Sequence, residues 1–184
     1  MSHQPMHRRH CLQLLGSAAA MGLHGMVAAR EVDAQAIGQL APWPAQQATP
    51  ALQVQSLQGT ARSLADYRGQ PLIVNFWATY CAPCRLEIPQ FNTLLQRYRP
   101  QGLRVLGINH GEMPARIAKF LQVVPFEGDV LLDRSQTQLP AWGGLALPTS
   151  FVLDAQGRIH WWHMGEIDWL REDIQAKLRQ TMGI

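Results

Sequence analysis

The sequence predicts an α/β fold with a mixed central β-sheet, helices on both faces and a β-hairpin extension on the N-terminal side. Two observations lead to this fold class. Nearly continuous apolar runs, typical of strands buried on both faces, alternate with segments of helical spacing. The chain then closes with a hairpin and a helix, an order that implies both parallel and antiparallel strands. With 47% hydrophobic residues among 184, the chain can bury a proper core.

The globular domain is expected to span residues 51–184, after a linker at 37–50 that is rich in Pro, Ala and Gln. Residues 52–64 alternate apolar and polar side chains around a Gln-Gly turn, which predicts a short hairpin. Residues 64–70 follow it as one helical turn that ends at a glycine. These two elements form the predicted N-terminal extension of the sheet.

The next segment contains the centre of the predicted sheet. The apolar run at 71–78 (PLIVNFWA) predicts a strand buried on both faces that leads directly into two cysteines. After the cysteines, residues 85–99 show helical spacing. Pro89 lacks an N–H and crowds the preceding turn, so it is expected to kink that helix. Residues 103–110 predict a second buried strand.

The remaining elements alternate between helix and strand. A helix is predicted at 114–124, with proline at its start, and a short strand at 129–133. Residues 136–149 contain two prolines and two glycines, which predicts a turn-rich connection. A hairpin follows at 150–164, and an amphipathic helix at 167–182 closes the chain.

The first 36 residues have the layout of an export signal, with a basic start, a weakly apolar stretch and a small-x-small site for cleavage. The adjacent Arg8 and Arg9 resemble a twin-arginine signal. The alternative is an uncleaved membrane anchor, because the stretch from 10 to 29 is just long enough to span a bilayer. Net charge is only +3 and is scattered, so nothing indicates binding to nucleic acid.

Cys81 and Cys84 form a CxxC pair, and Cys11 would be lost with the signal. Zinc requires about four ligands, and the remaining histidines of the mature chain are not at metal-ligand spacing from the pair; they are His110, His160 and His163. A structural disulfide across a CxxC closes a very small loop and stabilises weakly. No cofactor is therefore expected other than a redox-active disulfide.

Redox chemistry fits the position of the pair between a strand and a helix. Unpaired N–H groups and the positive dipole end of a helix N-terminus favour a thiolate over a thiol. Cys81 is expected to be the exposed nucleophile, and Cys84, one turn later, the buried resolving thiol. Pro83 fits the first turn, where its missing N–H costs nothing.

Two stretches, NFWATYCAPCRLEIP and GLALPTSFVLDAQGRI, resemble the thioredoxin superfamily. More narrowly they resemble its exported TlpA-like branch, which includes the thioredoxins of cytochrome c maturation. The resemblance covers about residues 50–184 and implies a thioredoxin-like fold. A CxxC alone is only suggestive, whereas a CxxC after FWA with a distant Leu-Pro-Thr is a strong signal.

The resemblance also implies roles for individual residues. Leu147 and Pro148 match the family's cis-proline, which binds the partner's backbone, although most X-Pro bonds are trans. Glu87 matches an acid that tunes the dithiol; burial would raise its pKa and let it take a proton from the second cysteine. The alternative is a solvated helix glutamate. Tyr80 and Trp77 are expected on the docking surface, with plain packing as the alternative for Tyr80.

The sequence departs from ordinary thioredoxins at Asn75, where they carry an aspartate. An amide cannot act as a base, so Glu87 becomes the candidate for proton transfer.

The resulting hypothesis is a monomeric periplasmic thiol–disulfide oxidoreductase, re-reduced by a membrane thiol reductase. It would reduce exported proteins such as apocytochrome c or metalloenzyme assembly factors. The rivals are an oxidase or isomerase of exported proteins, a peroxidase and a copper metallochaperone. Peroxidases of this superfamily usually place a threonine three residues before the reactive cysteine, whereas Thr79 lies two before Cys81.

Overall fold

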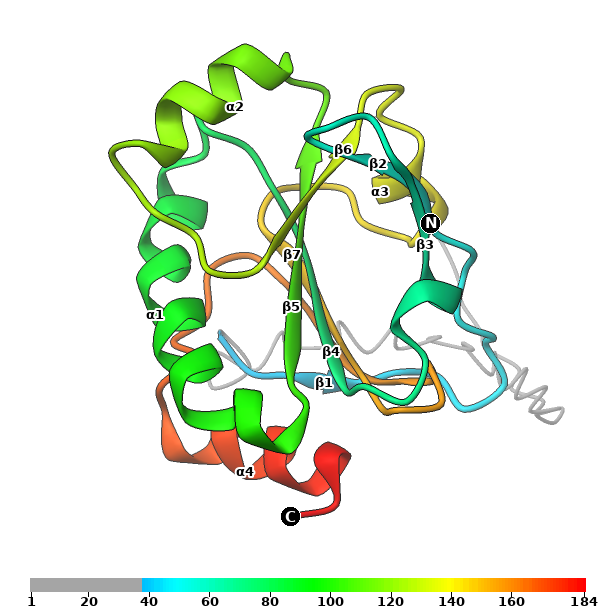
Figure 1. The fold of residues 1–184 in the computed structure, drawn as a ribbon. Coiled ribbons are helices and arrows are strands. Elements are labelled where there is room, and N and C mark those ends of the chain that lie inside the picture. The colour runs from blue at the N-terminus through cyan, green and yellow to red at the C-terminus, as the bar shows by residue number, and fades with distance from the viewer. Residues whose placement is uncertain (1–37) are drawn as a thin grey trace, which may run out of the picture. The chain divides into compact units, whose positions relative to one another are not determined.

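The structure is a computed structural model and describes residues 38–184, so the predicted export signal lies outside the described residues. Eight strands form one mixed sheet in the order β1-β8-β7-β4-β5-β6-β2-β3 (Figure 1). Strands β4, β5 and β6 are mutually parallel, and β7 runs antiparallel to β4. The strands are β1 (Ala41–Pro42), β2 (Gln53–Ser56), β3 (Ala61–Ser63), β4 (Leu72–Trp77), β5 (Arg104–His110), β6 (Asp129–Asp133), β7 (Thr149–Leu153) and β8 (Ile159–Met164).

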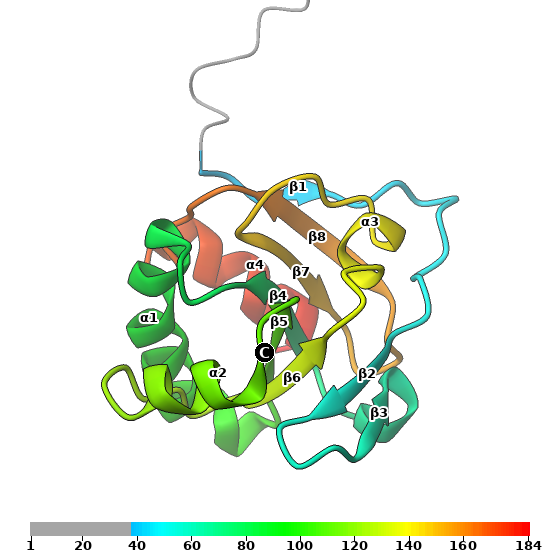
Figure 2. The same cartoon turned by 90° about the horizontal axis from the view of Figure 1, so that it is seen from above.

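Helices cover both faces of the sheet, as the sequence predicts (Figures 1 and 2). All six side chains of β4 are buried, and they alternate between the two faces. Ile73 packs with α1 (Ala82–Tyr98) and α4 (Glu172–Met182). Val74 packs on the other face with residues of α3 (Gln138–Ala141) and of a short 3₁₀ turn at Leu64–Tyr67. Helix α2 (Pro114–Leu121) packs beside the first turns of α1 through Ile117.

The structure differs from the prediction at three points. The first is the bounds of the helices: α1 begins at Ala82 instead of residue 85 and continues through Pro89 to Tyr98, α2 ends at Leu121 instead of 124, and α4 begins at Glu172 instead of 167. A short helix, α3, lies within the predicted turn-rich connection. It forms because the Asp133 carboxylate accepts hydrogen bonds from the first backbone N–H groups of this turn, including that of Gln138 at 2.9 Å.

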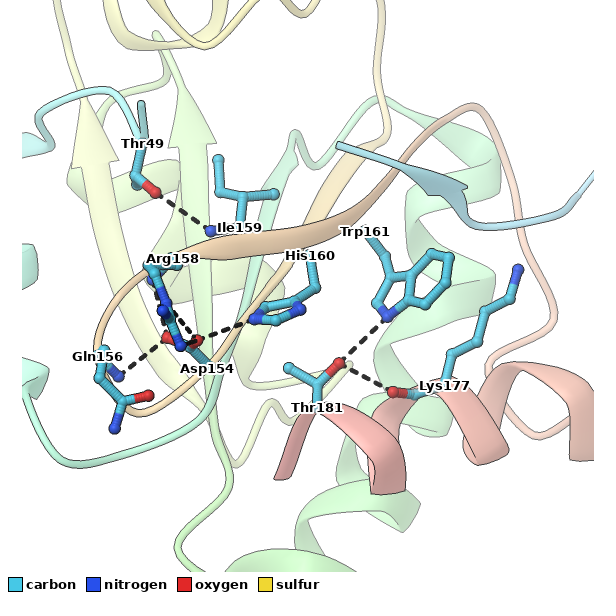
Figure 3. Close-up of polar contacts among 9 residues, drawn as sticks. All are labelled: Thr49, Asp154, Gln156, Arg158, Ile159, His160, Trp161, Lys177 and Thr181. Atoms are coloured by element: carbon cyan, nitrogen blue, oxygen red, sulfur yellow. Dashed lines mark hydrogen bonds and ion pairs between the residues drawn. The ribbon is translucent and has the colours of Figure 1, made fainter. Parts of the chain in front are cut away.

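The third difference is that part of the predicted linker at 37–50 joins the sheet. Ala41 and Pro42 form β1, which lies along β8 (Figure 2). Trp43 packs edge-on against Phe151 at 5.6 Å between ring centroids. Thr49 accepts a hydrogen bond from the backbone N–H of Ile159 at 3.1 Å (Figure 3). This segment is therefore attached to β8 from Ile159 to Trp162.

The β7–β8 hairpin is held by side-chain contacts at its turn and along β8 (Figure 3). The Asp154 carboxylate accepts from the backbone N–H of Arg158 and pairs with its guanidinium, and it lies 2.8 Å from the His160 ring. On the same strand, the Trp161 indole donates to Thr181 of α4 at 3.2 Å. The hairpin is thus anchored to the last helix.

The register of the sheet brings distant segments to one edge. Trp77, at the end of β4, lies opposite Asn109 near the end of β5, and Asn109 lies opposite Leu132 near the end of β6. Because β7 is antiparallel, its first residue, Thr149, lies at the same edge beside Phe76. The loops that leave or enter at these points contain the cysteines and the Leu-Pro-Thr motif.

Candidate active site

The two cysteines form a disulfide at the start of α1. Cys81 is the N-cap residue, and its sulfur accepts a hydrogen bond from the backbone N–H of Cys84 at 3.3 Å. Cys81 is 8% exposed and Cys84 only 1%, so both are buried and the prediction of an exposed Cys81 holds only relative to Cys84. The more accessible sulfur therefore sits at the positive end of a 17-residue helix with a donor already aimed at it, an arrangement that stabilises a thiolate.

The Leu147–Pro148 peptide bond is cis, as the family resemblance implies. Leu147 packs against the cluster of buried side chains that contains both cysteines. The loop is held by the Thr149 hydroxyl, which donates to the carbonyl of Ala146 at 2.6 Å. The cis-proline loop and the disulfide thus lie next to each other at the same edge of the sheet.

The two aromatic residues before the disulfide have different positions. Tyr80 is 63% exposed, so it can contact a docking protein. Trp77 is buried, and its ring packs on Phe120 of α2 at 5.5 Å between centroids. The prediction that Trp77 contacts a partner is therefore wrong: it supports the cysteine loop from the core.

Glu87 is fully buried, so it is not the solvated helix residue of the alternative interpretation. Its Oε1 accepts from the backbone N–H of Ile167 at 3.1 Å and from the Trp169 indole at 3.2 Å. Its Oε2 accepts from the Asn75 amide at 3.2 Å, and the same amide donates to the hydroxyl of Ser150 at 2.9 Å. The carboxyl group is therefore held by two segments besides its own helix, strand β4 and the loop between β8 and α4.

Burial raises the pKa of Glu87 from 4.5 to about 8, because the charged form loses its hydration. The donors Ile167, Trp169 and Asn75 act in the opposite direction and only partly offset this effect. The resulting pKa is close to that of an ordinary thiol, about 8.5. Glu87 can therefore exchange a proton with a thiol one helical turn away at little cost in free energy.

A second acid, Glu112, fixes the loop before the cysteines. It accepts hydrogen bonds from both the backbone N–H and the hydroxyl of Thr79, each at 2.6 Å. The Asn109 amide donates to it at 2.8 Å, and Arg116 forms an ion pair with it at 2.8 Å. Burial acts to raise the pKa of Glu112, but the hydrogen bonds from Asn109 and Thr79 outweigh burial and hold the pKa below its usual 4.5. Glu112 is thus a charged anchor for the cysteine loop.

Sequence reasoning did not identify Glu112, Ser150 or the Trp169 contact with Glu87. Trp169 packs in the core against Phe91, with 5.1 Å between ring centroids. Its indole N–H could not be assigned a partner because the acceptor lies 82 positions earlier. The only signal for Glu112 was its place just after the end of a buried strand at the same edge as the cysteines.

Within residues 38–184, no three His, Cys, Asp or Glu side chains come together in an arrangement that could hold a metal ion. Within the same range, no helix combines the length and apolar character needed to cross a bilayer.

Comparison with known proteins gives consistent results. The pattern of the AhpC/TSA family matches residues 45–162. The thiol-disulfide oxidoreductase ResA of Geobacillus thermodenitrificans (strain NG80-2) is 34% identical over 129 residues, covering 70% of this chain and 73% of the relative. ResA of Geobacillus kaustophilus (strain HTA426) is also 34% identical, over 66% of this chain and 69% of its own length.

Solved structures agree with these relatives. A DsbE-type thiol:disulfide interchange protein from Chlorobium tepidum superposes with a TM-score of 0.70 at 26% identity, covering 79% of this chain and all of the other. A thioredoxin-family thiol:disulfide interchange protein from Chlorobium tepidum TLS gives a TM-score of 0.63 at 25% identity, over 79% of this chain and 99% of that one.

Proposed function

The chain belongs to the AhpC/TSA family, as a ResA- and DsbE-like member of the TlpA-like branch of the thioredoxin superfamily, and we propose that it is a periplasmic protein-disulfide reductase. One observation carries the proposal. Cys81, the more accessible of the two cysteines, lies at a helix N-terminus beside the cis-Pro148 loop, and the buried Glu87 follows one turn behind Cys84. The nucleophile, the docking loop and the proton carrier therefore lie within one small region.

The reaction transfers two electrons from the reduced pair to a substrate disulfide. The Cys81 thiolate attacks one substrate sulfur, the substrate S–S bond breaks, and the other substrate sulfur leaves as a thiolate that takes up a proton. Cys84 then loses its proton to the Glu87 carboxylate and attacks the Cys81 sulfur. This step forms the Cys81–Cys84 disulfide and releases the second substrate thiolate, which is protonated in turn.

The reductive direction is supported by the dipeptide between the cysteines, Ala82-Pro83, since strong oxidants of the superfamily typically carry histidine there. The substrates would be exported proteins with disulfides, such as the CxxCH site of apocytochrome c or assembly factors of metalloenzymes. A membrane thiol reductase would return the protein to its dithiol state. The enzyme would act as a monomer and need no cofactor beyond its own cysteines.

Trapping tests the proposal directly. In Cys84→Ser the mixed disulfide on Cys81 cannot be resolved, so exported substrate proteins should accumulate on it, whereas the Cys81→Ser variant should capture none. Absence of any trapped exported protein would argue against the whole redox function. The reduction potential tests direction, and a value near −120 mV, typical of a strong oxidant, would overturn the reductant assignment.

Two rival functions have their own measurements. Peroxide consumption with an electron donor would indicate a peroxidase. Tight, stoichiometric retention of Cu(I) by the reduced protein, lost in Cys81→Ser, would indicate a copper metallochaperone.

A further inference from the structure

A groove of about 680 Å³ lies beside the disulfide, between α1 and the loop that follows α2. Its apolar lining includes Ala82, Leu86 and Pro89 from α1 and Val123 and Pro125 from the loop. Ala82 is the residue directly after the nucleophilic cysteine. The groove therefore begins next to the reacting cysteine.

The apolar side chains of the groove are exposed, although α1 has a buried face for its core contacts. Leu86 is 59% exposed and Val123 is 80% exposed. Ala82, Leu86 and Pro89 follow helical spacing and form an apolar stripe that the core does not use. An exposed apolar stripe of this kind, next to a reactive site, indicates a binding surface.

The groove is held in shape by polar contacts of Asn92. Its amide donates to the carbonyl of Pro125 at 2.9 Å and accepts from the backbone N–H of Glu127 at 2.9 Å. These bonds tie the loop to α1 across more than thirty positions of sequence. A preformed groove needs little ordering when a ligand binds, which favours affinity.

Two polar features at the groove select the chemistry of its ligand. Arg85 lies on the exposed face at the cysteine end, and within residues 38–184 it forms no ion pair with a carboxylate. Pro89 has no N–H, so the Arg85 carbonyl lacks its usual donor four residues later in the helix. The cation suits a carboxylate, and the carbonyl can accept from the backbone N–H of an extended chain.

We propose that this groove binds the segment of the protein substrate that flanks its reacting cysteine, with an apolar side chain against Leu86 and Val123 and a carboxylate at Arg85. The inference rests on the proposed function and adds a preference among substrates. Exposed segments that have an apolar and an acidic residue next to the cysteine react faster than segments whose flanking residues are neutral or basic. The groove is assigned to this ligand for two reasons. A carboxylate of the substrate complements the charge of Arg85, and the groove lies beside Cys81.

The test measures second-order rate constants for reduction of short peptide disulfides by the reduced protein, with released peptide thiol quantified after acid quenching. One peptide has Leu and Glu next to its cysteine. In the matched peptides, either the Leu is replaced by Ser or the Glu is replaced by Lys. Hydroxyethyl disulfide, a small neutral substrate that cannot fill the groove, gives the reference rate, and each peptide rate is divided by it. This ratio removes any effect of a substitution on the Cys81 thiolate itself.

The ratio for the Leu/Glu peptide should fall about tenfold in Val123→Ser, because one apolar side chain loses its contact surface. It should fall about fivefold in Arg85→Glu at low salt, with a smaller effect at high salt. The matched control is Arg62→Glu on the edge strand β3, which should leave every rate unchanged. Val123 and Arg85 are both exposed, so neither substitution is expected to disturb folding.

The outcomes separate the groove from the function. If the ratios are equal for all peptides and variants while hydroxyethyl disulfide is still reduced, the proposed binding of substrate in the groove is refuted but the proposed function is not. Failure to reduce hydroxyethyl disulfide would overturn the proposed function and this inference with it. A dimer in size-exclusion chromatography that disappears in Val123→Ser would assign the groove to a second copy of the chain and likewise contradict the proposal.

Discussion

Replacing Glu87 by glutamine removes the one fully buried carboxyl group beside the dithiol while it keeps an oxygen to accept from Ile167 and Trp169. In the native protein the pKa of this carboxyl is raised to about 8 by burial, against 4.5 for an ordinary glutamate. Below pH 4.5 the group is protonated in both the folded and the unfolded chain. As pH rises toward 8, the unfolded chain releases its proton while the folded protein holds it, so stability is lost.

The size of the effect follows from the two pKa values. At about 1.36 kcal/mol per pH unit, the difference between 4.5 and about 8 amounts to about 5 kcal/mol once the carboxylate is ionised in both states. Between pH 4 and pH 7 the expected loss is about 3 kcal/mol. Glu87→Gln has no such titration. The free energy of unfolding of the variant relative to wild type should therefore rise by about 3 kcal/mol over that interval.

Denaturant unfolding of the oxidised proteins at several pH values measures this difference. Taking the difference between variant and wild type cancels the titration of all other groups. Glu127→Gln is the matched control, because it makes the same substitution at an exposed position. Parallel stability profiles for Glu87→Gln and wild type would refute the reasoning, since they would mean that Glu87 titrates alike in the folded and unfolded chain.

Other predictions follow from the same contacts. Glu112→Gln should lower the free energy of unfolding by about 2 kcal/mol near pH 7, because the Thr79 donors lose a charged acceptor. Since the pKa of Glu112 is held below 4.5, this loss should shrink as pH falls through that range, and a pH-independent loss would contradict the charged state. Trp169→Phe removes a donor that lowers the pKa of Glu87 in the folded protein, so the stability loss assigned to Glu87 should still begin near pH 4.5 but continue to higher pH and become larger. Trp161→Phe removes the hydrogen bond to Thr181 and leaves the donors to Glu87 in place, so the pH at which this loss ends should not change; a change as large as in Trp169→Phe would show that the indole bond to Glu87 is not the cause.

The central strands and the order of elements could be predicted because their signal is local. The run from Leu72 to Trp77 is apolar at every position except one, and such a run is buried on both faces wherever it occurs. Strand β1 gave no such signal. Its two residues are a strand only because they pair with β8, and that contact depends on the assembled sheet. Helix α3 likewise depends on Asp133, whose carboxylate caps it from the preceding strand.

The residues of the candidate site likewise fall into two groups, those in short local motifs and those that depend on contacts between distant positions. The two cysteines, the cis-proline and Glu87 belong to short motifs, so their positions could be predicted from spacing and resemblance. Glu112 reaches Thr79 across 33 positions, and Trp169 reaches Glu87 across 82. No local pattern in one sequence specifies such pairs. The prediction for Trp77 fails for a different reason: its place in a motif suggested contact with a partner, whereas β4 is buried on both faces, so the side chain lies in the core.

The attachment of β1 along β8 also bears on how the molecule avoids self-association. An open sheet edge can recruit strands from other chains, and proteins counter this with very short edge strands, proline and charge. Here one edge is a two-residue strand that contains Pro42, which has no N–H to offer an incoming strand. The other edge, β3, has three residues and contains the exposed Arg62. Both margins of the sheet are therefore poor templates for aggregation, which would let the protein be kept at high concentration in its folded state.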